Sequence, residues 1–318
     1  MHFLETLLKA GADREFSDEP SNPFGFDPFS QRRRMPLGPS SLGKCPRQVA
    51  VILARGERKP EPLSRRLMMQ AGTEVGAVAE RWLERACSSQ GGLFIKTQGK
   101  VRVPINVPPE QLEKVEQGVS RARRKLPSCM LSMKGQTLSV PGTYDAALYC
   151  PSSKHLSMID VKSGHSFVVK KAKEGNTNDE YWDQLQAYTY AVVDDPDHYI
   201  MEGVEIESVS THLLFIDRSS GEVVPIDGAK WDSLAECQDS LCESVNASAS
   251  NLLTALSIYG DGTVHDPGVG AAHEANDKGN FPWQCNYCEV GPIVGMCHKG
   301  EGEVYSRKKG DAVTWHVR

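Results

Sequence analysis

The stretch "LSVPGTYDAALYCPSSKHLSMIDVKSG", residues 138–164, decides the fold. Residues 138–150 and 154–164 each alternate in polarity or run apolar over the length of a strand. The two segments lie close enough in sequence to pair as a hairpin. We therefore expect them to form the centre of a sheet.

Three of the charged residues in these strands could act together. Asp160 and Lys162 are two positions apart, so they point to the same face of their strand, and the hairpin brings Asp145 beside them. Two neighbouring carboxylates repel unless a cation lies between them, and hard oxygen ligands select Mg²⁺ or Mn²⁺. A lysine there can orient an attacking water, so the layout suits metal-assisted phosphodiester hydrolysis.

A solvated strand face is the plain alternative for an aspartate and a lysine two residues apart. The neighbours Met158, Ile159 and Val161 make the strand read as buried, and buried charges need a partner or a function. The segment "NDEYWDQLQAYTYAVV", residues 178–193, reads as a helix that carries Gln184 and Tyr188 on one face. These two side chains can hold phosphate oxygens or bind a neighbouring base, although such a pair taken alone more often belongs to a core or a surface.

The rest of the chain alternates between helical and strand patterns, which predicts one α/β domain with a central mixed sheet flanked by helices. Further helices are expected at 39–56, 64–89, 108–126 and 232–256, and further strands at 93–107 and within 209–226. We place this domain at 39–298, after an irregular N-terminal arm at 1–38. Residues 299–318 form a tail that could pair as a hairpin.

Composition, charge and the absence of certain motifs limit the classes of protein to which this sequence could belong. The chain has 318 residues and a net charge of −5, with basic clusters such as 121–125 and 170–173 that can hold phosphates locally. No apolar run approaches the roughly 18 residues of a membrane span, and the N-terminus lacks the pattern of a signal peptide. We expect a cytoplasmic protein that does not contact membranes. The sequence contains no GxxxxGK[ST], HExxH or GxSxG motif.

The segment "WQCNYCEVGPIVGMCHKG", residues 283–300, concentrates Cys285, Cys288 and Cys297. Nine cysteines are too sparse for a disulfide scaffold, so a tight group favours a metal or iron–sulfur site with four ligands. The spacing alone leaves zinc and iron–sulfur open, and His298 could serve as a zinc ligand.

In this order, "PGTYDAAL", "MIDVKSG" and "DQLQAYTYA" resemble the motifs of the RecB-like branch of the PD-(D/E)xK nucleases. That branch shows G-x-x-D, then D/E-x-K, then Q-x-x-x-Y. The resemblance implies a restriction-endonuclease-like core and puts Asp145, Asp160, Lys162, Gln184 and Tyr188 at the active site.

A subset of this branch, including CRISPR-associated adaptation nucleases and AddB-type subunits, carries a 4Fe–4S cluster. One cysteine precedes the nuclease core and three follow it. The resemblance therefore implies that Cys45, in "PSSLGKCPRQ", joins Cys285, Cys288 and Cys297 and links the N- and C-terminal segments.

The chain departs from the branch in an early helix, where Gly76 stands at the position of a metal-binding histidine. Glu80, four residues on, shares that helix face and is our choice for a third ligand of Mg²⁺ or Mn²⁺ beside Asp145 and Asp160. The alternative is a solvent-facing glutamate paired with Arg81 or Arg85.

The resemblance implies a Mg²⁺- or Mn²⁺-dependent DNA nuclease, an exonuclease acting on DNA ends or single strands in recombination, repair or replication. A helicase or recombination protein could be its partner. Two other classes stay open: a non-catalytic DNA-binding or scaffolding subunit with a structural Fe–S or zinc site, and a zinc-stabilised protein with an unrelated enzyme function.

Overall fold

The computed structural model describes residues 3, 4, 6, 7, 37–55, 63–126, 129–265, 304–309 and 312–317. The chain divides into two compact units that are interleaved in sequence. Unit 1 comprises Met1–Arg33, Glu61–Val103 and Pro141–Val245, and unit 2 comprises Arg34–Pro60, Pro104–Val140 and Asn246–Arg318. The stretch expected to be one domain, 39–298, is thus shared between both units.

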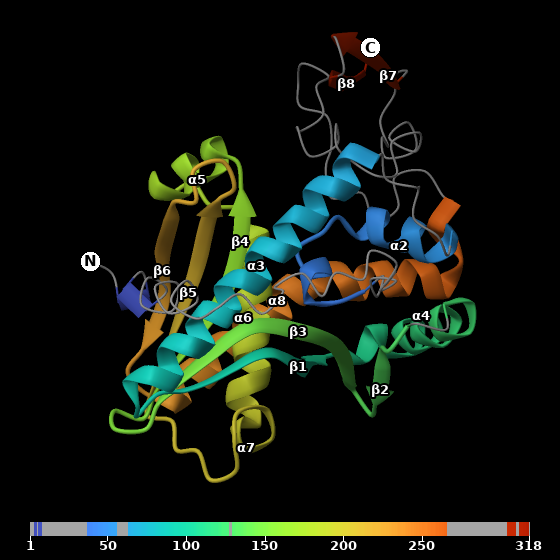
Figure 1. Cartoon of the computed structure of the whole chain (residues 1–318). Coiled ribbons are helices and arrows are strands. Elements are labelled where there is room, and N and C mark those ends of the chain that lie inside the picture. The colour runs from blue at the N-terminus through green and yellow to red at the C-terminus, as the bar shows by residue number, and fades with distance from the viewer. Residues whose placement is uncertain are drawn as a thin grey trace. The chain divides into compact units, whose positions relative to one another are not determined.

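The protein is an α/β protein with a mixed sheet flanked by helices (Figure 1). The strand order is β1-β3-β4-β5-β6, and β2 pairs with β3. β4 is antiparallel to β3 and parallel to β5, and β6 is antiparallel to β5. The strands are β1 (Phe94–Asn106), β2 (Ser132–Lys134), β3 (Thr137–Cys150), β4 (His155–Gly164), β5 (Ser208–Asp217) and β6 (Val223–Trp231).

In unit 1, helix α3 (Leu63–Gln90) covers one face of the sheet. Its apolar residues recur at helical spacing, so they form one stripe that packs on the sheet. The stripe and its sheet partners form a buried cluster: Ala79, Leu83, Ala86 and Cys87 from α3, and Ala146, Leu148, Ile159, Leu214 and Ile216 from β3, β4 and β5. Gly72 allows a close approach, because a Cβ there would lie 2.8 Å from Ser163 Oγ on β4.

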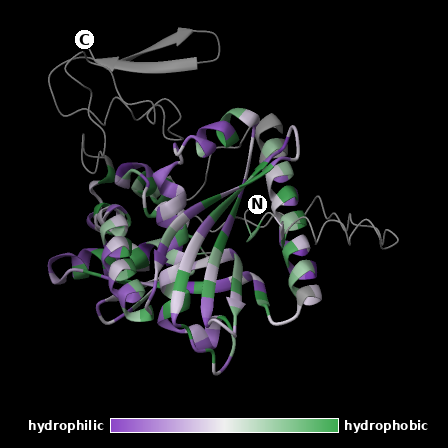
Figure 2. Cartoon of the chain, turned by 90° about the vertical axis from the view of Figure 1, so that its left-hand side faces the viewer, coloured by the Kyte–Doolittle hydropathy of each residue, from purple (hydrophilic) through white to green (hydrophobic). Residues whose placement is uncertain are grey.

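Helix α6 (Asp179–Asp194) packs on the opposite face of the sheet, and it connects β4 to β5 together with α5 (Ser166–Lys173) and α7 (Pro196–Tyr199). Asn178 caps α6 by accepting a hydrogen bond from the Glu180 N–H at 3.2 Å. Because side chains alternate across a strand, Asp160, Lys162 and Phe215 face α6 while Ile159 and Leu214 face α3. Bands of hydrophilic and hydrophobic residues along the strands are visible in Figure 2.

Unit 2 contains η1 (Pro39–Ser41), α2 (Pro46–Arg55), η2 (Pro109–Gln111), α4 (Leu112–Lys125), most of α8 (Leu234–Asp261) and η3 (Thr263–His265). Helices α4 and α8 approach closely at Gly118, where a Cβ would overlap the carbonyl oxygen of Leu256. Lys114 of α4 pairs with Asp261 of α8 at 2.7 Å. Two strands, β7 (Val304–Lys309) and β8 (Ala312–Val317), pair antiparallel within the expected tail.

The N-terminal residues differ from the irregular arm expected at 1–38. Residues 3, 4, 6 and 7 are helical, and the side chains of Leu4 and Leu7 are buried in the α3 cluster, because their apolar spacing fits a helix face. The remainder of that arm, up to residue 36, lies outside the described residues. Within the described parts of the chain, no helix is both long enough and apolar enough to span a bilayer.

Candidate active site

The site in unit 1 begins where β3 and β4 part. Their paired residues run from Cys150 and His155 to Ala146 and Ile159, where the register ends. At the next position Asp145 Oδ2 accepts a hydrogen bond from the Val161 N–H at 2.7 Å. The carboxylate thus satisfies a backbone donor that strand pairing has left free, and it holds the Asp145 side chain at the opening between the strands.

A chain of polar contacts runs from β4 to α6. Lys162 Nζ lies 2.6 Å from Asp160 Oδ2 and donates to Gln184 Oε1 at 3.2 Å. Gln184 Nε2 donates to the Tyr188 hydroxyl at 3.0 Å, as expected for residues four apart on a helix. The Lys162 ammonium also lies 4.8 Å from the centre of the Tyr181 ring. The five residues predicted from the strand and helix motifs therefore lie together.

Glu80 reaches the same region from α3. Only 8% of Glu80 is exposed, and its Oε1 accepts a hydrogen bond from Gln98 Nε2 of β1 at 2.7 Å. Its charge raises the pKa of Asp145, which places the two carboxyls within electrostatic range. Glu80 is therefore buried, and the alternative of a solvent-facing glutamate is wrong in this respect.

Burial dominates the electrostatics of all three carboxyls. Burial, followed by the charge of Asp160, raises the pKa of Asp145 to about 8, against the opposing effects of the Val161 N–H and Lys162. Burial also raises the pKa of Asp160, while Lys162 lowers it. Burial raises the pKa of Glu80 to about 7, and the Gln98 hydrogen bond lowers it. A positive ion placed among these groups would favour their ionised forms.

The donor set fits a hard divalent cation. It consists of carboxylate oxygens, and Asp160 Oδ2 is fully buried with no hydrogen bond, only the ion pair with Lys162. In the described arrangement, however, no three His, Cys, Asp or Glu side chains among the described residues are grouped closely enough to hold a metal ion. Asp145 accepts a backbone N–H through Oδ2 and Asp160 Oδ2 faces Lys162, so binding of one ion by all three carboxyls would involve a rearrangement of these side chains.

A Cβ at Gly76, where the resemblance leads us to expect a metal-binding histidine, would meet no atom within 4 Å. Cys45, predicted as the first cluster ligand, is half-buried just before α2 in unit 2. The other three predicted ligands, Cys285, Cys288 and Cys297, lie outside the described residues, as does His298.

The sequence reasoning missed three contributors to the site. Tyr181 lies three residues before Gln184, so helical periodicity could have identified it. The Val161 N–H is a backbone group, so the identity of the side chain at position 161 gives no indication of its contact with Asp145. Gln98 could not be found from sequence, because its contact with Glu80 depends on how β1 packs beside α3, and its backbone is left-handed, with φ of 49°.

No protein-family model and no curated protein matches the sequence. A solved structure described as "Crystal structure of SSO0001" aligns with 92% of this chain and 96% of its own, at 14% identity and a TM-score of 0.39. That TM-score is too low to carry an argument, so the proposals below rest on the residues of this chain.

Proposed function

We propose that this protein is a Mg²⁺- or Mn²⁺-dependent DNA nuclease of the RecB-like PD-(D/E)xK type, with a restriction-endonuclease-like core. The observation that carries the proposal is the meeting of Asp145, Asp160 and Lys162 with Gln184 and Tyr188 at the point where β3 and β4 part. Buried carboxyls with raised pKa values beside a lysine mark functional sites more often than structural ones.

Asp145, Asp160 and Glu80 would hold the divalent ion. When bound, such an ion neutralises charge on the scissile phosphate and makes water a better nucleophile at neutral pH. Lys162 would donate hydrogen bonds to the attacking water, and the contacts of its ammonium with Asp160 and Gln184 support this role. The Gln184 amide and the Tyr188 hydroxyl, which contact one another, would position the phosphate oxygens of the substrate strand.

Helix α5, which follows the Lys162 strand directly, supports a nucleic-acid substrate. Its Phe167 is 66% exposed, and Lys171 lies over that ring at 4.8 Å. The helix also carries Lys170 and Lys173. An exposed aromatic ring among lysines suits a single strand, whose bases stack and whose phosphates are negative. We therefore favour cleavage of single strands or DNA ends, as an exonuclease in recombination, repair or replication.

The decisive experiment is the degradation of end-labelled single- and double-stranded DNA with Mg²⁺ or Mn²⁺. Lys162→Ala should lower the rate about 100-fold or more, because it removes the group that handles the water. Lys154→Ala is the matched control: it removes a lysine at the other end of β4, paired with Glu205 and Glu207 on the surface. Equal cleavage by both variants would exclude the proposed site.

The iron–sulfur proposal is tested by metal content. Protein purified without air should be brown and contain about four irons, and Cys45→Ser should lower that content. Stoichiometric zinc without iron would instead support a zinc site.

A non-catalytic DNA-binding or scaffolding subunit is the second candidate. Gly76 in place of the histidine that the resemblance implies favours it, and the presence of Asp145, Asp160 and Lys162 opposes it. Calorimetry separates the two: Mn²⁺ binding that Asp145→Ala removes supports the nuclease, and no Mn²⁺ binding supports the subunit.

A further inference from the structure

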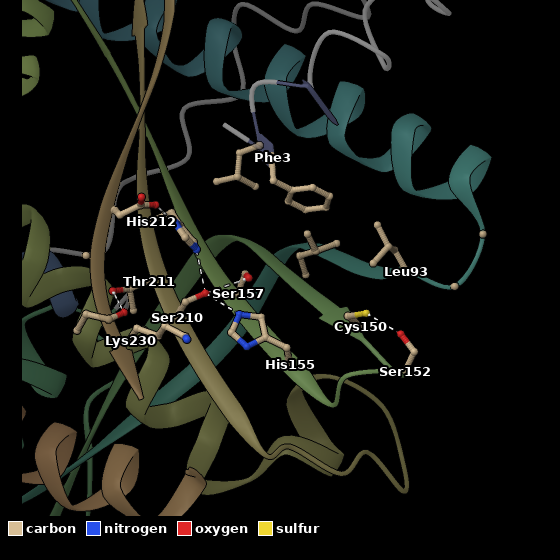
Figure 3. Close-up of a pocket in the computed structure, with 17 residues that line it drawn as sticks. Phe3, Leu93, Cys150, Ser152, His155, Ser157, Ser210, Thr211, His212 and Lys230 are labelled. Atoms are coloured by element: carbon tan, nitrogen blue, oxygen red, sulfur yellow. Dashed lines mark hydrogen bonds and ion pairs between the residues drawn. The ribbon is translucent and has the colours of Figure 1, made fainter. Parts of the chain in front are cut away.

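Unit 1 contains a cavity of about 760 Å³ that the nuclease proposal does not use (Figure 3). One wall is apolar and includes Phe3, Leu93 and Leu148. The other wall is polar and includes Ser157, Ser210 and His212. Ser157 pairs with Leu148, and Ser210 pairs with Ser157, so by strand alternation all three project to the α3 face. The cavity therefore lies on the opposite face of the sheet from Asp160 and Lys162.

The polar wall is a continuous chain of hydrogen bonds. Asp227 Oδ1 of β6 lies 2.8 Å from His212 Nδ1, and His212 Nε2 lies 2.9 Å from Ser210 Oγ. His155 Nε2 lies 2.8 Å from the same Ser210 oxygen, and its Nδ1 lies 2.7 Å from Ser208 Oγ. These distances are within the range expected between a nucleophile, its base and the group that orients the base.

With His212 neutral, the distances around Ser210 fit the following proton arrangement. A carboxylate only accepts, so His212 Nδ1 carries the proton that bonds to Asp227, and a neutral His212 leaves Nε2 as an acceptor. In this arrangement Ser210 donates its hydroxyl proton to His212 Nε2. Burial lowers the pKa of His155, which favours its neutral form, and its Nε2–H then donates to Ser210.

A β-bulge sets this alignment. The register of β5 and β6 shifts between Ser210 and His212, so Ser210 pairs with Lys230 while His212 pairs with Asp227. Between these two pairs, one residue on β5, Thr211, thus opposes two on β6, Gly228 and Ala229. Gly228 lies within the shift, and a Cβ there would overlap the ring of Trp182. Bulges are frequent next to active sites because they re-aim side chains.

We propose that Ser210 and His212, oriented by Asp227, form a second hydrolytic site that cleaves carboxylic esters with small apolar acyl groups. Ser210 Oγ attacks the carbonyl carbon of the ester while His212 Nε2 takes the hydroxyl proton. The bond from that carbon to the alcohol oxygen breaks, and the leaving alcohol takes the proton from His212. Water, deprotonated by His212, then attacks the acyl-Ser210 ester, releasing the acid and restoring the Ser210 hydroxyl.

The surroundings select this substrate class. The acyl group lies against the apolar wall at Phe3, Leu93 and Leu148, and the cavity volume admits a small molecule. Hydrogen bonds from His155 and from the Ser157 hydroxyl, 3.1 Å from Ser210 Oγ, stabilise the oxygen as it loses its proton. Asp227 is a positioning residue whose effect is moderate, because 65% of its side chain is exposed.

The test is labelling of the full chain with a fluorophosphonate probe, which phosphonylates activated serines, followed by peptide mass spectrometry. We expect stoichiometric label on Ser210, no label in Ser210→Ala, and labelling slowed about 100-fold or more in His212→Gln. Ser219→Ala, which removes an exposed serine from the β5–β6 turn, should label as the wild type does. The folded wild type should also hydrolyse p-nitrophenyl butyrate. The hydrolysis rates of the variants should follow the same order as their labelling rates.

Asp227→Asn separates positioning from a structural role. Removing the carboxylate makes protonated His212 less favourable, so the pH midpoint of labelling should move to lower pH while the rate falls. The other titratable groups among the described residues that line the cavity are Cys150, His155 and Lys230, and none of them is altered. No label on Ser210 in folded wild type, or labelling unaffected by His212→Gln, overturns the proposal.

Discussion

Replacing Glu80 by glutamine should make the protein more stable and less able to bind a divalent ion. Glu80 is buried, and burial raises its pKa from 4.5 to about 7. Glutamine has nearly the same shape, stays neutral and still accepts the hydrogen bond from Gln98. The substitution therefore removes an unfavourable charge without opening a cavity.

The magnitude follows from the pKa. Each pKa unit corresponds to about 1.4 kcal/mol, so the ionised Glu80 costs at most about 3 kcal/mol at pH 8, and contact with solvent reduces that figure to about 2 kcal/mol. Because folding raises the pKa of this carboxyl, the free energy of unfolding falls as the pH rises. Its stabilisation is fully present below pH 4.5 and is lost as the pH rises through about 7.

The assay is urea denaturation at pH 5 and pH 8 with a chelator present. The free energy of unfolding of Glu80→Gln should exceed that of the wild type by about 2 kcal/mol at pH 8 and by under about 1 kcal/mol at pH 5. The control Glu74→Gln, an exposed position on the same helix, should show no such difference. Excess Mn²⁺ should then stabilise the wild type, by about 2.7 kcal/mol at 100 times its Kd, and the Glu80→Gln variant by less.

Two results would refute this reasoning. A Glu80→Gln variant no more stable than the wild type at pH 8 would mean that the Glu80 charge is not destabilising. Equal stabilisation of both proteins by Mn²⁺ would mean that Glu80 is not a ligand.

Three glycines give further expectations. Gly76→His should strengthen Mn²⁺ binding in calorimetry, because the imidazole adds a ligand where a Cβ meets no atom within 4 Å, whereas Gly76→Ala should only stabilise α3, by about 1 kcal/mol in urea denaturation. Gly99→Ala should destabilise by about 1–3 kcal/mol, because its Cβ would overlap the Tyr144 ring; a Gly99→Ala variant as stable as the wild type would contradict this packing. Gly118→Ala should lower the melting temperature through its clash with the Leu256 carbonyl, and an unchanged temperature would show that α4 and α8 adjust freely.

The strongly periodic elements could be predicted from the sequence. The strand expected at 154–164 corresponds to β4, His155–Gly164, and the helix expected at 178–193 corresponds to α6, Asp179–Asp194. These segments have clear alternation or helical spacing. Helix α5 was not predicted, because its eight residues span barely two turns and its lysines suggested only a basic cluster.

The site could be predicted where the residues share one element or one hairpin. Asp160 and Lys162 follow from strand alternation, and Gln184 and Tyr188 follow from helix spacing. The contact of Glu80 with Gln98 joins residues 18 positions apart through the packing of α3 beside β1, which no local pattern encodes. The parallel pairing of β4 with β5 is likewise a long-range outcome.

The hydrogen bond from the Val161 N–H to Asp145 has a consequence for how mutants of this protein should be interpreted. The same carboxylate that would bind a metal ion also terminates the pairing of two central strands. If the proposed chemistry holds, one side chain serves both catalysis and folding, and an inactive Asp145 variant would report on both at once. Lys162, whose ammonium is held only through side-chain contacts, allows the two to be separated.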